Sequence, residues 1–201
     1  MEPLEVLKPL GITSDWVHTF LTESNAIDPQ PGSSEPGSPV YDGHREALLY
    51  ALYMSADDRY ALPYEVYKLL NRGESLGRGL RNQEVAIGGR AVLPHRMIKR
   101  ELFRWNRRVC QAIDSLRTDE DTIPEERKRA EIWGLHCELM SIHPYDHFNG
   151  KVGRILMVNH ALLTDAKAWV IPAASRQEYF NTIRQHPSAE WGTNPPTEDQ
   201  L

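Results

Sequence analysis

The chain has 201 residues, of which 40% are apolar and 25% are charged, and its formal net charge is −5. This length predicts a single domain that buries a core without disulfides or a structural metal. The longest apolar runs fall well short of about 18 residues, which excludes a membrane-spanning helix. The composition is that of ordinary globular proteins, which excludes wholesale disorder.

Cysteine use and the N-terminus both indicate the cytoplasm. Cys110 and Cys137 lie far apart and lack paired spacing, which fits reduced thiols better than a disulfide framework or a zinc site. The N-terminus has no basic stretch followed by apolar residues, the pattern of a secretory signal. We therefore expect a cytoplasmic protein with no membrane partner.

The acidic net charge gives no overall signature of nucleic-acid binding. One local group of cations is present, formed by Arg96, Lys99, Arg100, Arg104, Arg107 and Arg108. Their spacing distributes them around a helix, which favours a solvated helical surface over a polyanion site. No nucleic-acid partner is expected.

The N-terminal third predicts helices separated by a linker. Ser14 can cap a helix whose apolar residues form one stripe and which ends near Asn25. Residues 29–39 are rich in proline, glycine and serine, and this composition predicts an exposed linker. Helical spacing returns in residues 44–56 and 63–70.

The middle of the chain predicts one β-hairpin. Residues 84–87 alternate like a strand, Gly88-Gly89 offers a tight turn, and residues 91–93 can return. The remaining segments with helical spacing are 94–116, 124–142, 150–163 and 179–183. The expected fold class is therefore all-α, a helical bundle core with a small β-hairpin flap.

The segment between two of these helices carries the chemically informative residues. Pro144 cannot continue a helix, so the chain must turn directly after His143 and leave this histidine at a helix end. The next helix begins near Asn149, and its free N–H groups and positive dipole end favour an anion. A histidine facing a phosphate site suits a general base. The alternative is a structural loop with a capping asparagine and surface cations.

Residues 143–154 resemble the signature loop of the Fic (filamentation induced by cAMP) family, His-Pro-Phe-x-Asp/Glu-Gly-Asn-Gly-Arg-x-x-Arg. Four further features occur in the family's order: the helix that includes His136, the hairpin of residues 79–89, the helix of residues 94–105, and the segment 176–180. The resemblance covers roughly residues 40 to 185 and implies the Fic fold.

The resemblance implies a role for each matching residue. His143 matches the general base that accepts a proton from a Ser, Thr or Tyr hydroxyl of a target protein while AMP is transferred from ATP. The implied nucleotide- and phosphate-binding residues are Asn149, Gly150, Lys151, Gly153 and Arg154. The residues implied to dock an extended target segment by backbone pairing are Glu84, Val85, Ala86 and Ile87.

The loop departs from the family pattern at three adjacent roles. His147 stands where the family has its acidic magnesium ligand, and imidazole binds Mg²⁺ poorly. The neighbouring Asp146 is shifted by one residue, which is expected to point its carboxylate elsewhere, so no residue is assigned as a metal ligand and Mg²⁺ binding is expected to be weak. Phe148 replaces a glycine, so its side chain disfavours a positive φ and close approach to phosphate. Lys151 replaces an arginine and loses bidentate phosphate contact.

Residues 24–28, Ser-Asn-Ala-Ile-Asp, resemble the inhibitory motif of some Fic proteins, Ser/Thr-x-x-x-Glu-Gly/Asn. In those relatives the glutamate pairs with the second signature arginine, which corresponds to Arg154, and blocks the nucleotide. The resemblance implies inhibitory roles for Ser24 and Asp28. The alternative is an unrelated helix terminus.

The sequence thus predicts three segments: an N-terminal helix and linker (1–41), a Fic core (42–187) and a flexible tail (188–201). The first functional hypothesis is a Fic-type transferase of AMP, or of a related nucleotide or phosphate moiety, with altered or weak activity. An inactive Fic-like module that binds proteins through the flap is the alternative. A metal hydrolase built on His136, His143 and His147 is a weaker third hypothesis, because their spacing does not suggest a three-ligand site.

Overall fold

The computed structural model describes residues 5–72, 79–87, 90–118 and 123–186. Its helices are η1 (Glu5–Leu10), α1 (Ser14–Ile27), α2 (Pro39–Ala56), α3 (Pro63–Leu70), η2 (His95–Met97), α4 (Ile98–Thr118), α5 (Glu125–Ile142), α6 (Asn149–Leu163), η3 (Ala173–Ser175) and α7 (Arg176–Gln185). The strands β1 (Ala86–Ile87) and β2 (Arg90–Ala91) form an antiparallel pair. The expected all-α architecture with a small hairpin is confirmed.

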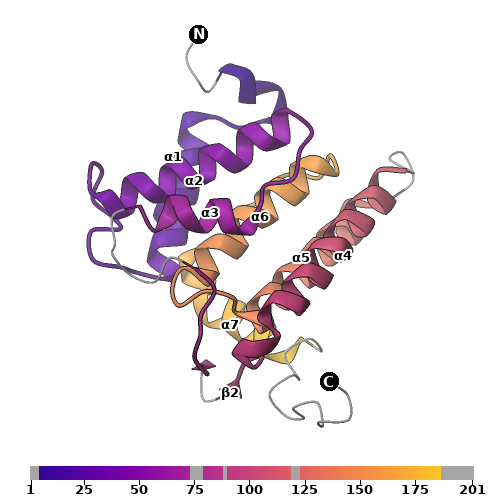
Figure 1. Ribbon diagram of the computed structural model, residues 1–201. Helices are drawn as coiled ribbons and strands as arrows, with labels where there is room; N and C mark the ends of the chain where they lie inside the picture. Colours follow the sequence, from indigo (N-terminus) through magenta and orange to yellow (C-terminus); the bar gives the residue numbers. More distant parts are fainter. Residues whose placement is uncertain (1–4, 73–78, 88–89, 119–122, 187–201) are drawn as a thin grey trace.

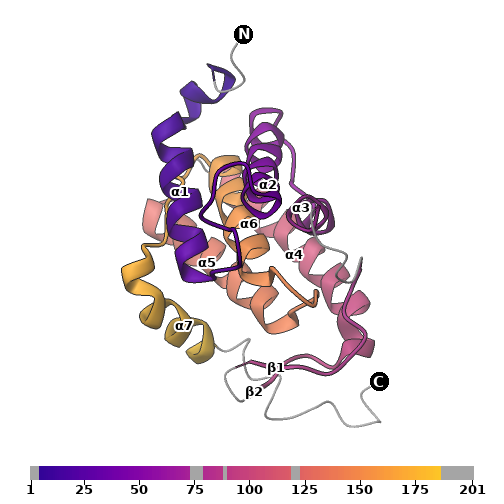
Figure 2. The same ribbon diagram turned by 90° about the vertical axis from the view of Figure 1, so that its left-hand side faces the viewer.

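Helix α6 is the centre of the molecule. Figure 1 shows α4 and α5 side by side, with α2 and α3 on the other side of α6, and Figure 2 shows α6 enclosed among them. Every residue of α6 except Gly150 is buried. A helix that is buried all round must be surrounded by other elements, and α2, α3 and α5 contact α6 along its length.

One hydrophobic cluster joins most of the helices. It includes Val17 and Phe20 from α1, Leu48 from α2, Trp105 from α4 and Ile155 from α6. Helix α1 therefore packs into the same core as the helices that follow it. Its C-terminal end lies close to the N-terminal part of α6, and this proximity shapes the site described below.

Local signals explain where the helices begin, and two boundaries differ from the expectation. Thr13, and not Ser14, caps α1, because its Oγ1 accepts a hydrogen bond from the Trp16 amide at 3.1 Å. Helix α2 begins at Pro39, where proline suits the first turn, rather than at residue 44. Its N-cap is Ser38, whose Oγ accepts from the Tyr41 amide.

Most residues of the linker predicted at 29–39 are exposed, as expected, but hydrogen bonds hold the segment in place. Ser33 is buried, and its main-chain carbonyl accepts a hydrogen bond from the Asn25 side chain at 2.5 Å. The hydroxyl of Ser38 donates to the Gly32 carbonyl. Hydrogen bonds to α1 and within the loop thus fix a segment whose composition alone indicated solvent exposure.

The hairpin is shorter than predicted. Ala86 pairs with Ala91 and Ile87 with Arg90, and the Val92 amide donates to the Val85 carbonyl at 3.3 Å just outside the strands. The predicted Gly88-Gly89 turn and the predicted tail 188–201 lie outside the described residues. Within the described part of the chain, no helix combines the length and apolar character needed to cross a membrane.

Candidate active site

The loop between α5 and α6 has a left-handed residue at each end. His143 ends α5 with φ 46° and ψ 62°, and Phe148 precedes α6 with φ 63° and ψ 7°. Non-glycine residues rarely adopt this region, and each such residue costs about 1–2 kcal/mol. Phe148 therefore accepts the positive φ that its side chain was expected to disfavour. Its burial in the core compensates for the strain.

Two side chains fix the inside of the loop. Asn149 accepts a hydrogen bond from the Tyr145 amide at 3.0 Å and donates to the Tyr145 carbonyl at 2.7 Å. The Tyr145 ring is fully buried and stacks on Tyr67 with 4.1 Å between ring centroids. The Asn149 side chain thus closes the loop, while the loop directs the start of α6 toward a cavity.

This cavity has a volume of about 310 Å³ and lies at the N-terminal end of α6. Its polar lining comes from the loop, the α6 terminus and the end of α1, and it includes Asp28, His143, Asp146, His147, Asn149, Gly150 and Arg154. The flap and α7 supply apolar lining, including Ile87 from β1 and Phe180 from α7. A histidine, a helix N-terminus and an apolar wall therefore meet in one space.

His143 is predominantly neutral at physiological pH in this cavity. Burial and the positive charge of Arg81 lower its pKa to about 4, against smaller opposing effects of the Met140 carbonyl and the Asp28 carboxylate. A neutral imidazole can accept a proton, as a general base must. The electrostatics of the site thus suit the role that the sequence predicts for His143.

Arg81 was not identified by the sequence analysis as a site residue. Its guanidinium is buried and donates from Nε to the His143 carbonyl at 2.7 Å. The same side chain bonds to carbonyls of both arms of the flap. Arg81 lies 62 residues before His143, so no local spacing in the sequence could indicate that the two residues are in contact.

Two predicted phosphate-binding cations contact α1. Arg154 donates from Nε to the Ser24 hydroxyl at 2.9 Å and from Nη2 to the Ser24 carbonyl at 3.0 Å. Lys151 is fully buried, and its Nζ donates to the Asp28 carbonyl at 2.5 Å. A third cation, Arg176 on α7, donates to the Ile27 carbonyl at 2.8 Å. The C-terminal end of α1 thus contacts cations from α6 and α7.

A search of solved structures finds the same architecture in a Fic domain containing signaling protein from Bacteroides thetaiotaomicron VPI-5482. The TM-score is 0.72 at 13% sequence identity, and the match covers 96% of this chain and 80% of that chain. This chain has a Fic fold. No family model and no curated protein matches the sequence.

Within this Fic fold, the predicted pairing between Asp28 and Arg154 is absent. Asp28 lines the cavity, but the described residues include no ion pair between its carboxylate and Arg154, whose guanidinium bonds to Ser24 instead. Asp28 contributes its main-chain carbonyl to Lys151. The α1 terminus is therefore in contact with α6, but main-chain oxygens and a serine hydroxyl make the contact.

The carboxylate of Asp146 was expected to point elsewhere, and its direction stays a prediction, although the residue lies at the cavity. Asp146 lines the cavity together with the exposed His147. Its Oδ1 is buried and has no hydrogen-bond partner among the described residues. A carboxylate residue thus lies at the cavity one residue before the position of the acidic residue in the Fic signature.

Gly153 and His136 serve helix packing. A Cβ at Gly153 would lie 2.6 Å from Met140 Cε and 2.7 Å from the His136 ring, so this glycine lets α5 and α6 approach closely. His136 Nε2 lies 3.0 Å from the Tyr179 hydroxyl. Neither Lys151 nor Gly153 lines the cavity. Across the described ranges, no group of three or more His, Cys, Asp or Glu side chains could hold a metal ion, so the geometry does not support the three-histidine hydrolase.

The flap borders the cavity of the Fic fold. Ile87 of β1 and Val92 beyond β2 both line it. The carboxylate of Glu84 contacts His95 Nδ1 at 2.8 Å and accepts from the His95 amide, so this residue fastens the flap to η2. Of the predicted docking residues, the structure therefore places Ile87 at the cavity and Glu84 at the base of the flap.

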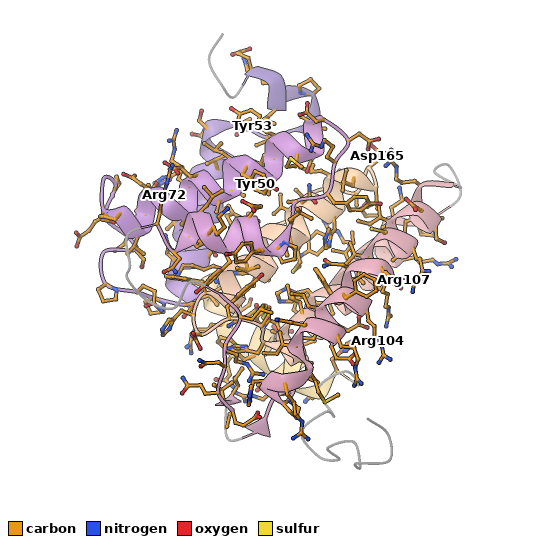
Figure 3. All side chains as sticks on the ribbon, in the orientation of Figure 1. Tyr50, Tyr53, Arg72, Arg104, Arg107 and Asp165 are labelled. Carbon is orange, nitrogen blue, oxygen red and sulfur yellow. The ribbon has the colours of Figure 1, made fainter. Side chains whose placement is uncertain are left out.

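The basic residues of α4 lie on its solvent-exposed side, as Figure 3 shows for Arg104 and Arg107. Arg100 and Arg104 bond to Glu101, and Arg108 pairs with Glu138 of α5. Three of the six cations thus pair with carboxylates, two of them with the same one. This arrangement fits the predicted solvated helical surface.

Proposed function

We propose that the protein is a Fic-type transferase that moves AMP, or a related nucleotide or phosphate moiety, from a nucleotide donor to a hydroxyl group of a protein. The observation that supports this most directly is that neutral His143 and the open N-terminus of α6 line the same cavity. The Fic fold agrees with the proposal. The flap beside the cavity provides an edge along which a target segment can lie.

The reaction assigns one role to each part of the site. His143 accepts the proton of a target hydroxyl as that oxygen forms a bond to the α-phosphorus of the donor. The bond from this phosphorus to the β-phosphate oxygen breaks, and pyrophosphate leaves. The amides at the start of α6 and the positive end of its dipole stabilise the negative charge on the phosphates.

Of the loop residues at the cavity, Asp146 has the side-chain chemistry to hold a divalent cation. Mg²⁺ prefers oxygen ligands and is often held by one or two carboxylates together with substrate phosphates. Asp146 is a carboxylate residue at the cavity, whereas the imidazole of His147 is a poor magnesium ligand. When bound, the ion would neutralise charge on the donor phosphates. Asp146→Asn is expected to weaken Mn²⁺ binding measured by electron paramagnetic resonance in the presence of nucleotide.

Helix α1 is proposed to inhibit the enzyme. The carbonyls of Ser24, Ile27 and Asp28 are bonded to Arg154, Arg176 and Lys151, and of these three cations Arg154 lines the cavity. The C-terminal end of a helix carries partial negative charge and can therefore occupy a cationic site. We propose that the main chain of α1, more than the Asp28 carboxylate, provides this inhibition.

The experiment compares two ways of removing this block. Ala26 is exposed in the last turn of α1, and Ala26→Pro is expected to break that turn without removing a packed side chain. The variant is incubated with a cell lysate and ATP labelled at either the α- or the γ-phosphate. Label transferred only from α-labelled ATP indicates AMP transfer, and label only from γ-labelled ATP indicates phosphate transfer.

The controls are Asp28→Ala and the double variant Ala26→Pro/His143→Asn. Asparagine tolerates the left-handed backbone of residue 143 and removes the base. Labelling that persists in the double variant contradicts the role of His143. Equal labelling by Asp28→Ala and Ala26→Pro contradicts inhibition through the main chain. If no donor nucleotide labels any protein, the transferase is contradicted.

One observation favours the alternative of a non-catalytic module. Ile87 is among the few large apolar side chains exposed on the described surface, and it lies on the flap. An exposed apolar residue beside a strand edge suits the capture of an extended peptide. A partner whose affinity falls with Ile87→Asp but is unchanged by His143→Asn would support this alternative.

A further inference from the structure

Arg81 connects three segments that are distant in the sequence. It is 2% exposed, and its guanidinium reaches four main-chain carbonyls. The donors are Nε to His143 at 2.7 Å, Nη1 to Gln83 at 2.8 Å, Nη2 to Ile142 at 3.3 Å, and Nη2 to Leu93. Gln83 and Leu93 lie on the two arms of the flap, and the other two residues end α5.

Main-chain hydrogen bonds join the same segments that the Arg81 side chain joins. The Arg81 amide donates to the Pro144 carbonyl at 2.9 Å, and Leu80 forms an isolated antiparallel bridge with Tyr145. On the other arm, the Leu93 amide donates to the Ser141 carbonyl at 3.3 Å. The two arms of the flap therefore flank the segment that contains His143, and Arg81 lies where they meet it.

Only arginine can make this set of bonds. Its planar guanidinium has five N–H donors in a rigid fork, whereas lysine has one ammonium group on a flexible chain. Buried carbonyls need partners, so the loss of the guanidinium would leave several of them unsatisfied at once. His143 holds a left-handed backbone that persists only when surrounding contacts enforce it, and the bond from Nε to its carbonyl is one such contact.

We propose that Arg81 is a positioning residue, which holds His143 in its left-handed conformation and ties the flap to it, so that a target segment docked on the flap meets the base in a fixed register. This inference rests on the proposed function, because it assigns the flap to target docking and His143 to proton transfer. Arg81 itself does not line the cavity. It acts through the main chain of the residues that do.

Charge supports the same assignment. The positive charge of Arg81 is one of the causes that lower the pKa of His143 to about 4, second to burial. The acidic groups nearest to this pair are Asp28, which acts in the opposite direction on His143, and Asp146 and Glu84, which interact with Arg81. Arg81 thus favours the neutral imidazole as well as the position of its backbone.

The test uses the full chain and requires neither donor nor target. Arg81→Gln removes both the charge and the fork, Arg81→Lys removes only the fork, and Arg96→Gln removes a charge from an exposed residue of η2 as a matched control. Nuclear magnetic resonance follows the titration of the His143 imidazole. Amide hydrogen exchange follows Val92 and Leu93, whose N–H groups bond to Val85 and Ser141.

We expect the pKa of His143 to rise in Arg81→Gln and to change less in Arg81→Lys. Exchange at Val92 and Leu93 is expected to be at least about tenfold faster in both variants, because the bonds to the flap are lost in both. Exchange in the buried part of α2, which makes none of these bonds, is expected to stay as in the parent chain and in Arg96→Gln.

Two results would overturn the proposal. One is an unchanged His143 titration in Arg81→Gln together with unchanged exchange in the flap. The other is faster exchange throughout the core, which would assign Arg81 a general structural role. If Arg81→Gln does not fold, the exchange pattern of Arg81→Lys decides alone.

Activity provides a further readout once a donor and a target are known. A displaced base is expected to lower kcat by about 100-fold in both Arg81 variants, without rescue by lysine. A fall confined to Arg81→Gln would contradict the role of the fork. A protein without transferase activity would contradict the proposed function, whereas the resonance and exchange measurements would still test whether Arg81 positions His143.

Discussion

Arg154 on α6 donates two hydrogen bonds to Ser24 on α1, one to its hydroxyl oxygen and one to its carbonyl. The two residues are 130 positions apart in the sequence, and both are almost fully buried. Through this contact the N-terminal helix is tied to the helix that begins at the candidate active site. The contact therefore has consequences for stability as well as for access to the cavity.

Ser24→Ala is expected to destabilise the protein by about 1–3 kcal/mol, because a buried guanidinium loses a hydrogen-bond acceptor. Urea denaturation followed by circular dichroism measures the change. Thr22→Ala on the exposed side of α1 is the control, since it alters helix propensity without touching Arg154. Equal free energies of unfolding for the two variants would show that the bond contributes nothing.

Tyr145→Phe is expected to raise the free energy of unfolding by about 1 kcal/mol. The Tyr145 hydroxyl is buried and has no hydrogen-bond partner among the described residues, so it is desolvated without compensation. The aromatic stacking on Tyr67 remains in the variant. Tyr67→Phe is the matched comparison, because the Tyr67 hydroxyl accepts a bond from Asn71. A loss of stability in Tyr145→Phe would reveal a partner for its hydroxyl.

Gly153→Ala and Gly134→Ala are expected to have opposite effects. The first places a Cβ 2.6 Å from Met140 Cε and 2.7 Å from the His136 ring, so overpacking should cost about 1–3 kcal/mol. In the second, the nearest atom to the new Cβ is His186 Nε2 at 3.8 Å, which is ordinary contact. Alanine should therefore stabilise this helical position by about 0.5–1 kcal/mol. Thermal denaturation of both variants tests this, and a stable Gly153→Ala would contradict the close approach of α5 and α6.

Stability is expected to fall as the pH drops below about 6.5. Burial lowers the pKa of His136 and of His160 to about 3 and lowers that of His44 well below its usual value. Below the unfolded pKa the unfolded chain binds protons that the folded chain excludes, so each histidine contributes a loss of about 1.4 kcal/mol per pH unit.

Denaturation curves between pH 6.5 and 5 measure this dependence. His160→Gln removes one titrating group. The free energy of unfolding of this variant is therefore expected to fall by about 1.4 kcal/mol less per pH unit than that of the parent chain. His18→Gln on the exposed side of α1 is the control. A stability that stays constant across this window would contradict the burial of these histidines in neutral form.

Much of the fold could be predicted because its signals are local. The period of apolar residues identifies helices, and Pro39, Pro63 and Pro144 mark where helices begin or end. The turn after His143 follows from the proline alone. Helix boundaries were harder to predict, since Thr13 and Ser14 are both suitable caps and Thr13 is the one that caps α1.

The site could be predicted only in part. The position of His143 at a helix end followed from the sequence, but the left-handed backbone at both ends of the loop did not, because non-glycine residues rarely adopt it. The expectation for Asp28 assumed that its side chain makes the contact to α6. In the structure the main chain of α1 does so, and no sequence pattern reports on carbonyl oxygens.

By itself, the sequence determined the helical segments, the hairpin and the loop that carries His143, because propensity, periodicity and proline geometry act within a few residues. Only the tertiary structure decided that Ser24 faces Arg154 and that Arg81 holds His143, over separations of 130 and 62 residues. Such contacts form where buried polar groups must find partners once the helices pack. The core thus selects partners that local spacing cannot specify.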